Sequence, residues 1–108
     1  MIEKLILKYK SLILAQLESE DCDDDRMKDL LIELESCNYM LHFNEDFEPF
    51  LNTLKFKNKK DKAKFELNTI QAAVNNLPWK EDHEYKFKKA CRKTLTWLFW
   101  TLKSGGDR

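Results

Sequence analysis

The chain has 108 residues, of which 43% are apolar and 12% aromatic, so it can bury a hydrophobic core without disulfides or structural metals. The scarcity of Gly and Pro, with two of each, favours long helices, and a single Val disfavours a β-rich fold. We therefore predict one all-α domain that spans residues 1–108.

Opposite charges are concentrated in opposite halves of the sequence, although the net charge is zero. Residues 1–54 contain 5 Lys or Arg and 13 Asp or Glu, a balance of −8, whereas residues 55–108 contain 14 and 6, a balance of +8. Such an asymmetry can be neutralised within the fold, between copies of the chain arranged head to tail, or by a charged partner. The sequence leaves these three alternatives open.

Targeting signals and membrane spans are not expected. Charges interrupt the first ten residues, unlike the apolar region of a signal peptide, and the longest apolar run, Leu95 to Leu102, is far shorter than the ~20 residues that cross a bilayer. Three Cys without paired spacing indicate reduced thiols. These features predict a cytoplasmic protein with no membrane partner, and the Lys/Asn/Phe-rich composition fits a bacterial or phage source.

The first half of the chain predicts two long helices and one short one. The first runs from Ile2 to Ser19 and is followed by the acidic run Glu18 to Asp25, where we expect an N-cap at Asp24 or Asp25. The second runs from Arg26 to Phe43 and is expected to bury one arc of residues: Met27, Leu30, Leu34, Cys37 and Leu41. A short helix, Phe47 to Phe56, is expected to follow, with Asn44 or Asp46 as its cap and Pro49 in its first turn.

The second half predicts two more long helices. Asn58 and Asp61 resemble a loose capping box, after which the apolar positions Ala63, Leu67, Ile70, Val74 and Leu77 recur at helical spacing until Pro78. The last helix begins after Trp79 and ends near Ser104, with Gly105 and Gly106 as a left-handed cap. Four long helices and one short helix predict a small antiparallel bundle, with an orthogonal packing as the alternative.

Catalytic and metal-binding motifs find little support. Asp21, Asp23 and Asp25 have the spacing of the first ligands of a calcium loop, but Arg26 and Ile32 stand where that loop needs Gly and Glu. The Cys and His residues show neither CxxC nor HxxxH spacing, and no Gly-rich phosphate loop is present. We therefore predict a protein that is not an enzyme and has no cofactor or metal.

The last helix carries the one candidate site. One side has the apolar spacing of a core, at Phe87, Cys91, Leu95, Leu98 and Leu102. The other side aligns three ammonium groups with two indoles, which is typical of a binding surface: Lys86, Lys89, Lys93, Trp97 and Trp100. The plainer interpretation, that a neighbouring helix buries both indoles, is equally consistent with the pattern.

The prediction for function follows from this face and from the charge asymmetry. We expect a small non-enzymatic interaction module, such as an inhibitor, an immunity protein or an assembly subunit, that binds a partner protein or a second copy of itself. The alternative is a helical nucleic-acid-binding subunit of a larger ribonucleoprotein or defence complex. In either case a second basic segment would contact phosphates or an acidic partner through Lys57, Lys59, Lys60, Lys62 and Lys64.

Overall fold

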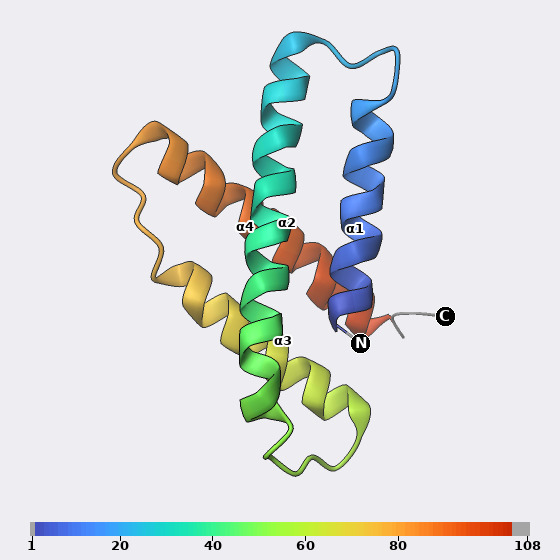
Figure 1. Ribbon diagram of the computed structural model, residues 1–108, viewed down its shortest axis with the longest axis vertical. Coiled ribbons are helices and arrows are strands. Elements are labelled where there is room, and N and C mark those ends of the chain that lie inside the picture. The colour runs from blue at the N-terminus through green and yellow to red at the C-terminus, as the bar shows by residue number, and fades with distance from the viewer. Residues whose placement is uncertain (1, 105–108) are drawn as a thin grey trace.

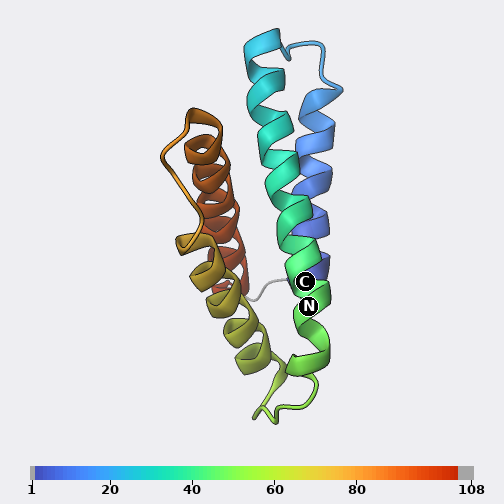
Figure 2. The same ribbon diagram turned by 60° about the vertical axis from the view of Figure 1, so that its left-hand side comes forward.

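The computed structural model of the chain describes residues 2–104 and folds them into four helices. These are α1 (Ile2–Leu17), α2 (Asp24–Leu51), α3 (Lys59–Asn75) and α4 (Asp82–Lys103). Figure 1 shows α1 beside α2 as one hairpin, with α3 and α4 as a second hairpin that crosses behind it. In Figure 2 the two hairpins appear as two layers. The prediction of an all-α fold is confirmed.

The hydrophobic core lies between the two hairpins and takes side chains from all four helices. α1 contributes Ile2, Leu5, Ile6 and Ile13, α2 contributes Leu30, Cys37 and Met40, α3 contributes Ala63, Leu67, Ile70 and Val74, and α4 contributes Cys91, Leu95, Leu98 and Leu102. The predicted buried positions of the last two helices are confirmed, apart from Leu77 and Phe87, which are only partly buried. Met27 was expected in the core but is 40% exposed.

α2 is longer than predicted, because the separate short helix expected over Phe47 to Phe56 is part of it. Asn44 does not cap a new helix. Its side chain points inward, and its Nδ2 donates a hydrogen bond to Glu66 Oε2 of α3 at 2.7 Å. Pro49 lacks a backbone N–H and removes one bond from the helical ladder, but it lies near the end of α2, where that loss is tolerated.

The helix caps follow from short polar side chains. Asn58 caps α3 as predicted, because its Oδ1 accepts from the Asp61 backbone N–H at 2.9 Å. The cap of α2 is Asp23, so the prediction of Asp24 or Asp25 is wrong by one or two residues. Both of these carboxylates instead lie in the first turn, where the helix dipole favours negative charge. The predicted glycine cap at Gly105 and Gly106 lies outside the described residues.

Replacing Asp23 by alanine should lower the free energy of unfolding by about 1 kcal/mol, because the Arg26 N–H at 2.8 Å would lose its side-chain acceptor. Asp24→Ala serves as the matched control, since it removes a first-turn charge but no capping bond, and it should cost less than half as much. Urea titrations followed by circular dichroism measure both effects. Equal losses would mean that Asp23 acts only through its charge.

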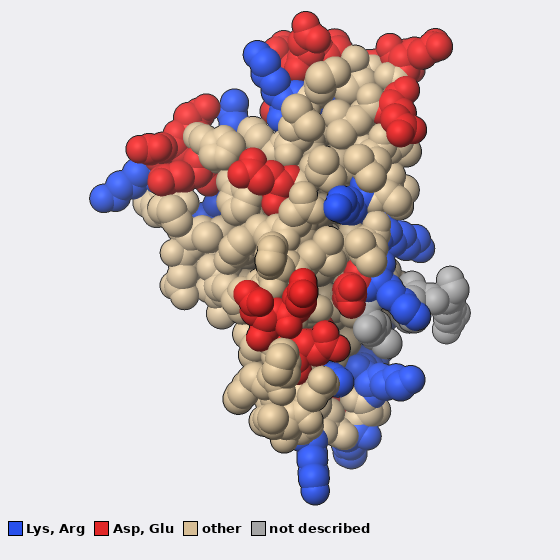
Figure 3. Space-filling view, viewed as in Figure 1, with Lys and Arg blue, Asp and Glu red and all other residues tan. Residues whose placement is uncertain are grey.

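The acidic segment around residues 18–29 and the lysine-rich segment around residues 55–64 lie at opposite ends of the molecule, whose longest dimension is 46 Å. The turn between α1 and α2 carries a group of carboxylates at one end, and lysines cluster at the other end around the turn between α2 and α3 (Figure 3). None of the helices in residues 2–104 combines the length and the apolar character needed to cross a bilayer.

Candidate functional site

The solvent-facing side of α4 is cationic along its length. From Tyr85 to Lys103 the sequence contains six Lys or Arg and no Asp or Glu. Because one side of the helix is fixed in the core by Cys91, Leu95 and Leu98, the opposite side must face outward. At steps of three and four, six exposed residues line this side, which we call the outer face of α4: Tyr85, Lys89, Arg92, Thr96, Trp100 and Lys103.

Large aromatic side chains are exposed on or beside the outer face. Trp100 is 68% exposed and Tyr85 is 52% exposed, and Trp79, from the segment between α3 and α4, is 64% exposed. Scattered exposed apolar residues are ordinary on protein surfaces, but Trp is usually buried to a large extent. Three such rings close to unopposed cations are the composition found at binding hot spots.

The five residues predicted as one contact face are divided by the fold. Only Lys89 and Trp100 belong to the outer face. Trp97 is half-buried and packs against Tyr9 of α1, with ring centroids 5.2 Å apart. Lys86 and Lys93 lie beside α2. Lys93 Nζ pairs with Glu33 Oε1 of α2 at 2.8 Å, whereas Lys86 pairs with Asp82 of its own helix at 3.5 Å.

A groove of about 450 Å³ runs between α2 and α4. Its charges nearly cancel, because four cations face three carboxylates: Arg26, Lys86, Lys89 and Lys93 against Asp29, Glu33 and Asp82. The hydrogen bond to Glu33 raises the pKa of Lys93, which keeps this ammonium charged and occupied. The groove therefore joins the acidic hairpin to the basic one and neutralises part of the charge asymmetry within the fold.

A second hollow, which we call the aromatic-cationic pocket, has no carboxylate in its lining. It measures about 280 Å³ and is lined by Trp79, Tyr85, Lys88, Lys89 and Arg92. Lys88 holds its wall in place, because Nζ donates to the carbonyls of Asn75 at 3.0 Å and Leu77 at 3.1 Å. These bonds tie the segment that carries Trp79 to α4. Lys89 lines both this pocket and the groove between α2 and α4, but neither Lys89 nor Arg92 makes an ion pair with any residue in 2–104, so both ammonium and guanidinium groups can contact a ligand.

The lysines of the second predicted contact lie around the turn between α2 and α3. Lys57, Lys59, Lys60 and Lys64 are exposed, whereas Lys62 Nζ donates to Asn52 Oδ1 at 3.2 Å. The sequence prediction missed a cluster of aromatic rings beside them, whose centroids lie 5.4 to 6.2 Å apart: Phe43, Phe47, Phe50, Phe56 and Phe65. The spacing of Phe43, Phe47 and Phe50 by four and three residues was the available signal, since it continues one helix face past Pro49.

The buried polar residues serve the fold. Asn44 and Glu66 lie beside a polar hollow of about 300 Å³ between α1, α2 and α3. Burial raises the pKa of Glu66, and the hydrogen bond from Asn44 partly offsets that rise. Burial also raises the pKa of the Cys37 thiol to about 11 and that of the Cys91 thiol to about 12, so neither is a thiolate nucleophile at neutral pH. Nowhere in residues 2–104 do three His, Cys, Asp or Glu side chains gather as a metal site would require.

The surface chemistry of α4 is suited to holding an anionic partner. The outer face offers unpaired cations and exposed rings, and the aromatic-cationic pocket offers a concave place for one planar or negatively charged group. The inference of function depends on this chemistry alone, since no protein-family model, no curated protein and no solved structure matches the chain.

Proposed function

We propose that the protein is a non-enzymatic interaction module that binds an acidic surface of a partner protein through the outer face of α4. The exposure of Trp100 is the observation that carries this proposal, because the ring is 68% exposed on a helix that has no carboxylate after Glu84 within residues 2–104. A partner would cover that ring and gain the apolar contribution of its burial. The cations on either side would select a negatively charged surface.

In the proposed contact, the Trp100 ring is buried at the centre and charged side chains surround it. Truncating a Trp that acts as an interface hot spot typically costs about 2 kcal/mol or more of binding free energy. Lys89 and Arg92, which make no ion pair within residues 2–104, would steer an acidic partner and raise the association rate, an effect that weakens with salt. The hairpin of α1 and α2, which carries most of the acidic residues, forms the other layer of the molecule (Figure 2), and the six residues of the outer face are exposed.

A single-stranded nucleic acid is the second candidate, and the aromatic-cationic pocket is the observation that favours it. Trp79 and Tyr85 could stack a base while Lys89 and Arg92 contact phosphates. Two features argue against a nucleic-acid partner. The acidic residues of α2 would repel the phosphates of a strand, and the small number of Arg leaves no continuous positive groove along which a strand could bind.

Two binding measurements, each with its own variants, separate the two candidates. The double variant Trp100→Ala/Arg92→Glu should lose at least tenfold of the binding to a protein captured from nuclease-treated extract of the native cell and then purified. Phe50→Ala is the control, since it removes another exposed ring, 54% exposed, from α2 and not from α4, and it should bind normally. Equal affinity of all three proteins would refute the proposed face.

The nucleic-acid reading has its own readout. If the partner is a protein, Trp79→Ala and Arg92→Glu should not change any binding of a labelled oligothymidine that fluorescence anisotropy detects. The opposite result would be tight binding at about 50 mM salt that weakens tenfold or more at about 200 mM salt and is lost in both variants. It would show that the partner is a single-stranded nucleic acid and not a protein.

A further inference from the structure

The end of the molecule formed by the turn between α2 and α3 combines positive charge with exposed apolar groups, and we call it the basic end (residues 50–64). It contains six Lys against Asp61 alone, a net charge of +5. Asp61 is in the first turn of α3, where the helix dipole stabilises it. Phe50 is 54% exposed, and its ring packs on Phe47 at 5.4 Å, so it is held in a fixed position at the surface.

The opposite end, formed by the turn between α1 and α2, has the complementary composition, and we call it the acidic end (residues 18–29). It contains seven Asp or Glu against Arg26 and Lys28, a net charge of −5. Three apolar side chains in or beside this segment are exposed as well, namely Leu14, Met27 and Leu31. Asp23 is engaged as the cap of α2, but the flanking carboxylates make no ion pair within residues 2–104.

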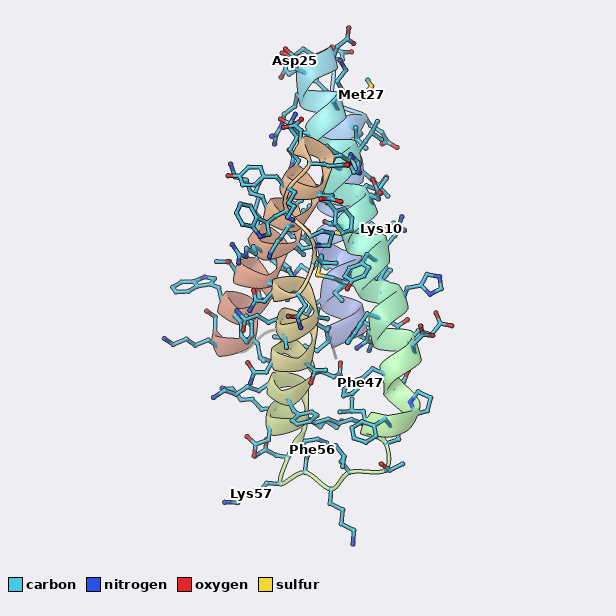
Figure 4. The ribbon with its side chains drawn as sticks, turned by 90° about the vertical axis from the view of Figure 1, so that its left-hand side faces the viewer. Lys10, Asp25, Met27, Phe47, Phe56 and Lys57 are labelled. Carbon is cyan, nitrogen blue, oxygen red and sulfur yellow. The ribbon has the colours of Figure 1, made fainter. Side chains whose placement is uncertain are left out.

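Figure 4 shows how far apart the two ends are. Asp25 and Met27 lie at one extreme of the vertical axis, and Phe56 and Lys57 lie at the other. The longest dimension of the molecule is 46 Å, several times the Debye length of about 8 Å at physiological ionic strength. The two ends therefore cannot neutralise one another within one molecule.

We infer that copies of this chain associate end to end, with the basic end of one copy against the acidic end of the next. Charges of equal size and opposite sign meet in this contact, and the exposed apolar side chains of both ends are covered by it. A lone partner protein would satisfy one end only, whereas a second copy satisfies both kinds of surface at once.

The geometry determines the form of the assembly. Because the two contacting surfaces are different and lie at opposite ends, the contact is heterologous and each added copy presents a new free end. The product is a series of oligomers that grows with concentration, rather than a closed dimer. The contact is small and partly electrostatic, so it should be reversible and should weaken with salt.

The first test is the mass of the purified protein in sedimentation equilibrium. At about 20 mM salt the average mass should rise steadily above the 13.0 kDa of one chain as the concentration approaches about 1 mM, and about 300 mM salt should weaken the association at least tenfold. A single 13.0 kDa species over that range at low salt, or a closed dimer that salt does not affect, would overturn the inference.

The second test reverses the charges of one end at a time. Lys57→Glu/Lys59→Glu/Lys60→Glu makes both ends acidic, and Asp21→Lys/Asp24→Lys/Asp25→Lys makes both ends basic while leaving the Asp23 cap in place. Each variant alone should stay monomeric, and an equimolar mixture of the two should associate again. Failure of the mixture to associate, with both variants folded by circular dichroism, would overturn the end-to-end contact.

A matched control separates this inference from the proposed function. Lys89→Glu/Arg92→Glu/Lys103→Glu carries the same number of charge reversals, but on the outer face of α4. It should abolish binding of the acidic partner and leave self-association unchanged. If this variant became monomeric while the lysine variant of the basic end still associated, the acidic end would be binding α4, and the end-to-end contact would be wrong.

Discussion

Replacing Trp97 by alanine should lower the free energy of unfolding by about 2 kcal/mol, whereas Trp100→Ala should change it by less than about 0.5 kcal/mol. The two indoles are three residues apart on α4, but they have different surroundings. Trp97 is half-buried against Tyr9 of α1, so its removal leaves a cavity between the two hairpins. Trp100 is mostly exposed, and its removal leaves no cavity.

Urea titrations of the two variants, followed by far-UV circular dichroism, measure this difference. Tyr9→Ala is a useful companion to Trp97→Ala, and the double variant should lose less than the sum of the two single losses because the rings contact each other. A large loss from Trp100→Ala would show that this ring supports the fold, and the outer face of α4 would then have to be defined without it.

Replacing Asn44 by alanine should lower the free energy of unfolding by about 2 kcal/mol at pH 7. The substitution removes the amide that donates to Glu66 at 2.7 Å and leaves a carboxylate, itself only 9% exposed, without that donor. The pair also links α2 to α3, so its loss weakens the contact between the two hairpins.

The loss should depend on pH in a defined direction. Burial raises the pKa of Glu66 above its ordinary value of 4.5, so the folded state binds a proton more readily than the unfolded state does. The resulting stabilisation is fully present below the unfolded pKa and is lost as the pH rises through the folded pKa. The hydrogen bond from Asn44 lowers the Glu66 pKa, so Asn44→Ala should raise it further and cost less at pH 5 than at pH 7.

Glu66→Gln provides the control, since glutamine keeps an oxygen to accept from Asn44 but cannot ionise. This variant should be at least as stable as the parent at pH 7 and should lose the decline of stability with rising pH that Glu66 causes. An Asn44→Ala defect of the same size at both pH values would indicate that the amide matters through packing and not through the carboxylate.

The helices of the second half could be predicted closely because several local signals agree there. Asn58 places a side-chain oxygen three residues before a free backbone N–H, and the apolar residues from Ala63 to Val74 repeat at one spacing. Pro78 then ends the pattern. The same agreement between spacing and burial holds for α4 from Cys91 to Leu102.

The end of α2 was mispredicted because tertiary contacts override local signals there. Asn44, Asp46 and Pro49 are all residues that commonly mark a helix boundary. Asn44 is instead drawn inward by Glu66, which lies 22 residues later in the chain, and the rings of Phe47 and Phe65 pack across the two helices at 6.2 Å. No pattern within a short window contains either partner.

The candidate face was predicted about a sixth of a helical turn away from the most exposed side of α4. Periodicity separates the core side of a helix from its other sides, but it does not show where the neighbouring helices lie. In the fold, α1 covers Trp97 through Tyr9, and α2 lies beside Lys93 through Glu33. The outward side consequently passes through Arg92 and Lys89, and it gains Tyr85, which the sequence alone gave no reason to choose.

The positions of the three cysteines give the native chain a selective chemical handle. Cys37 on α2 and Cys91 on α4 are sealed between the hairpins and stay protonated at neutral pH, so alkylating reagents reach them only when the hairpins separate. Cys22 is partly exposed in the turn between α1 and α2. A maleimide dye therefore attaches first at that turn, without any engineered cysteine, and slower labelling of the other two thiols reports how often the hairpins open.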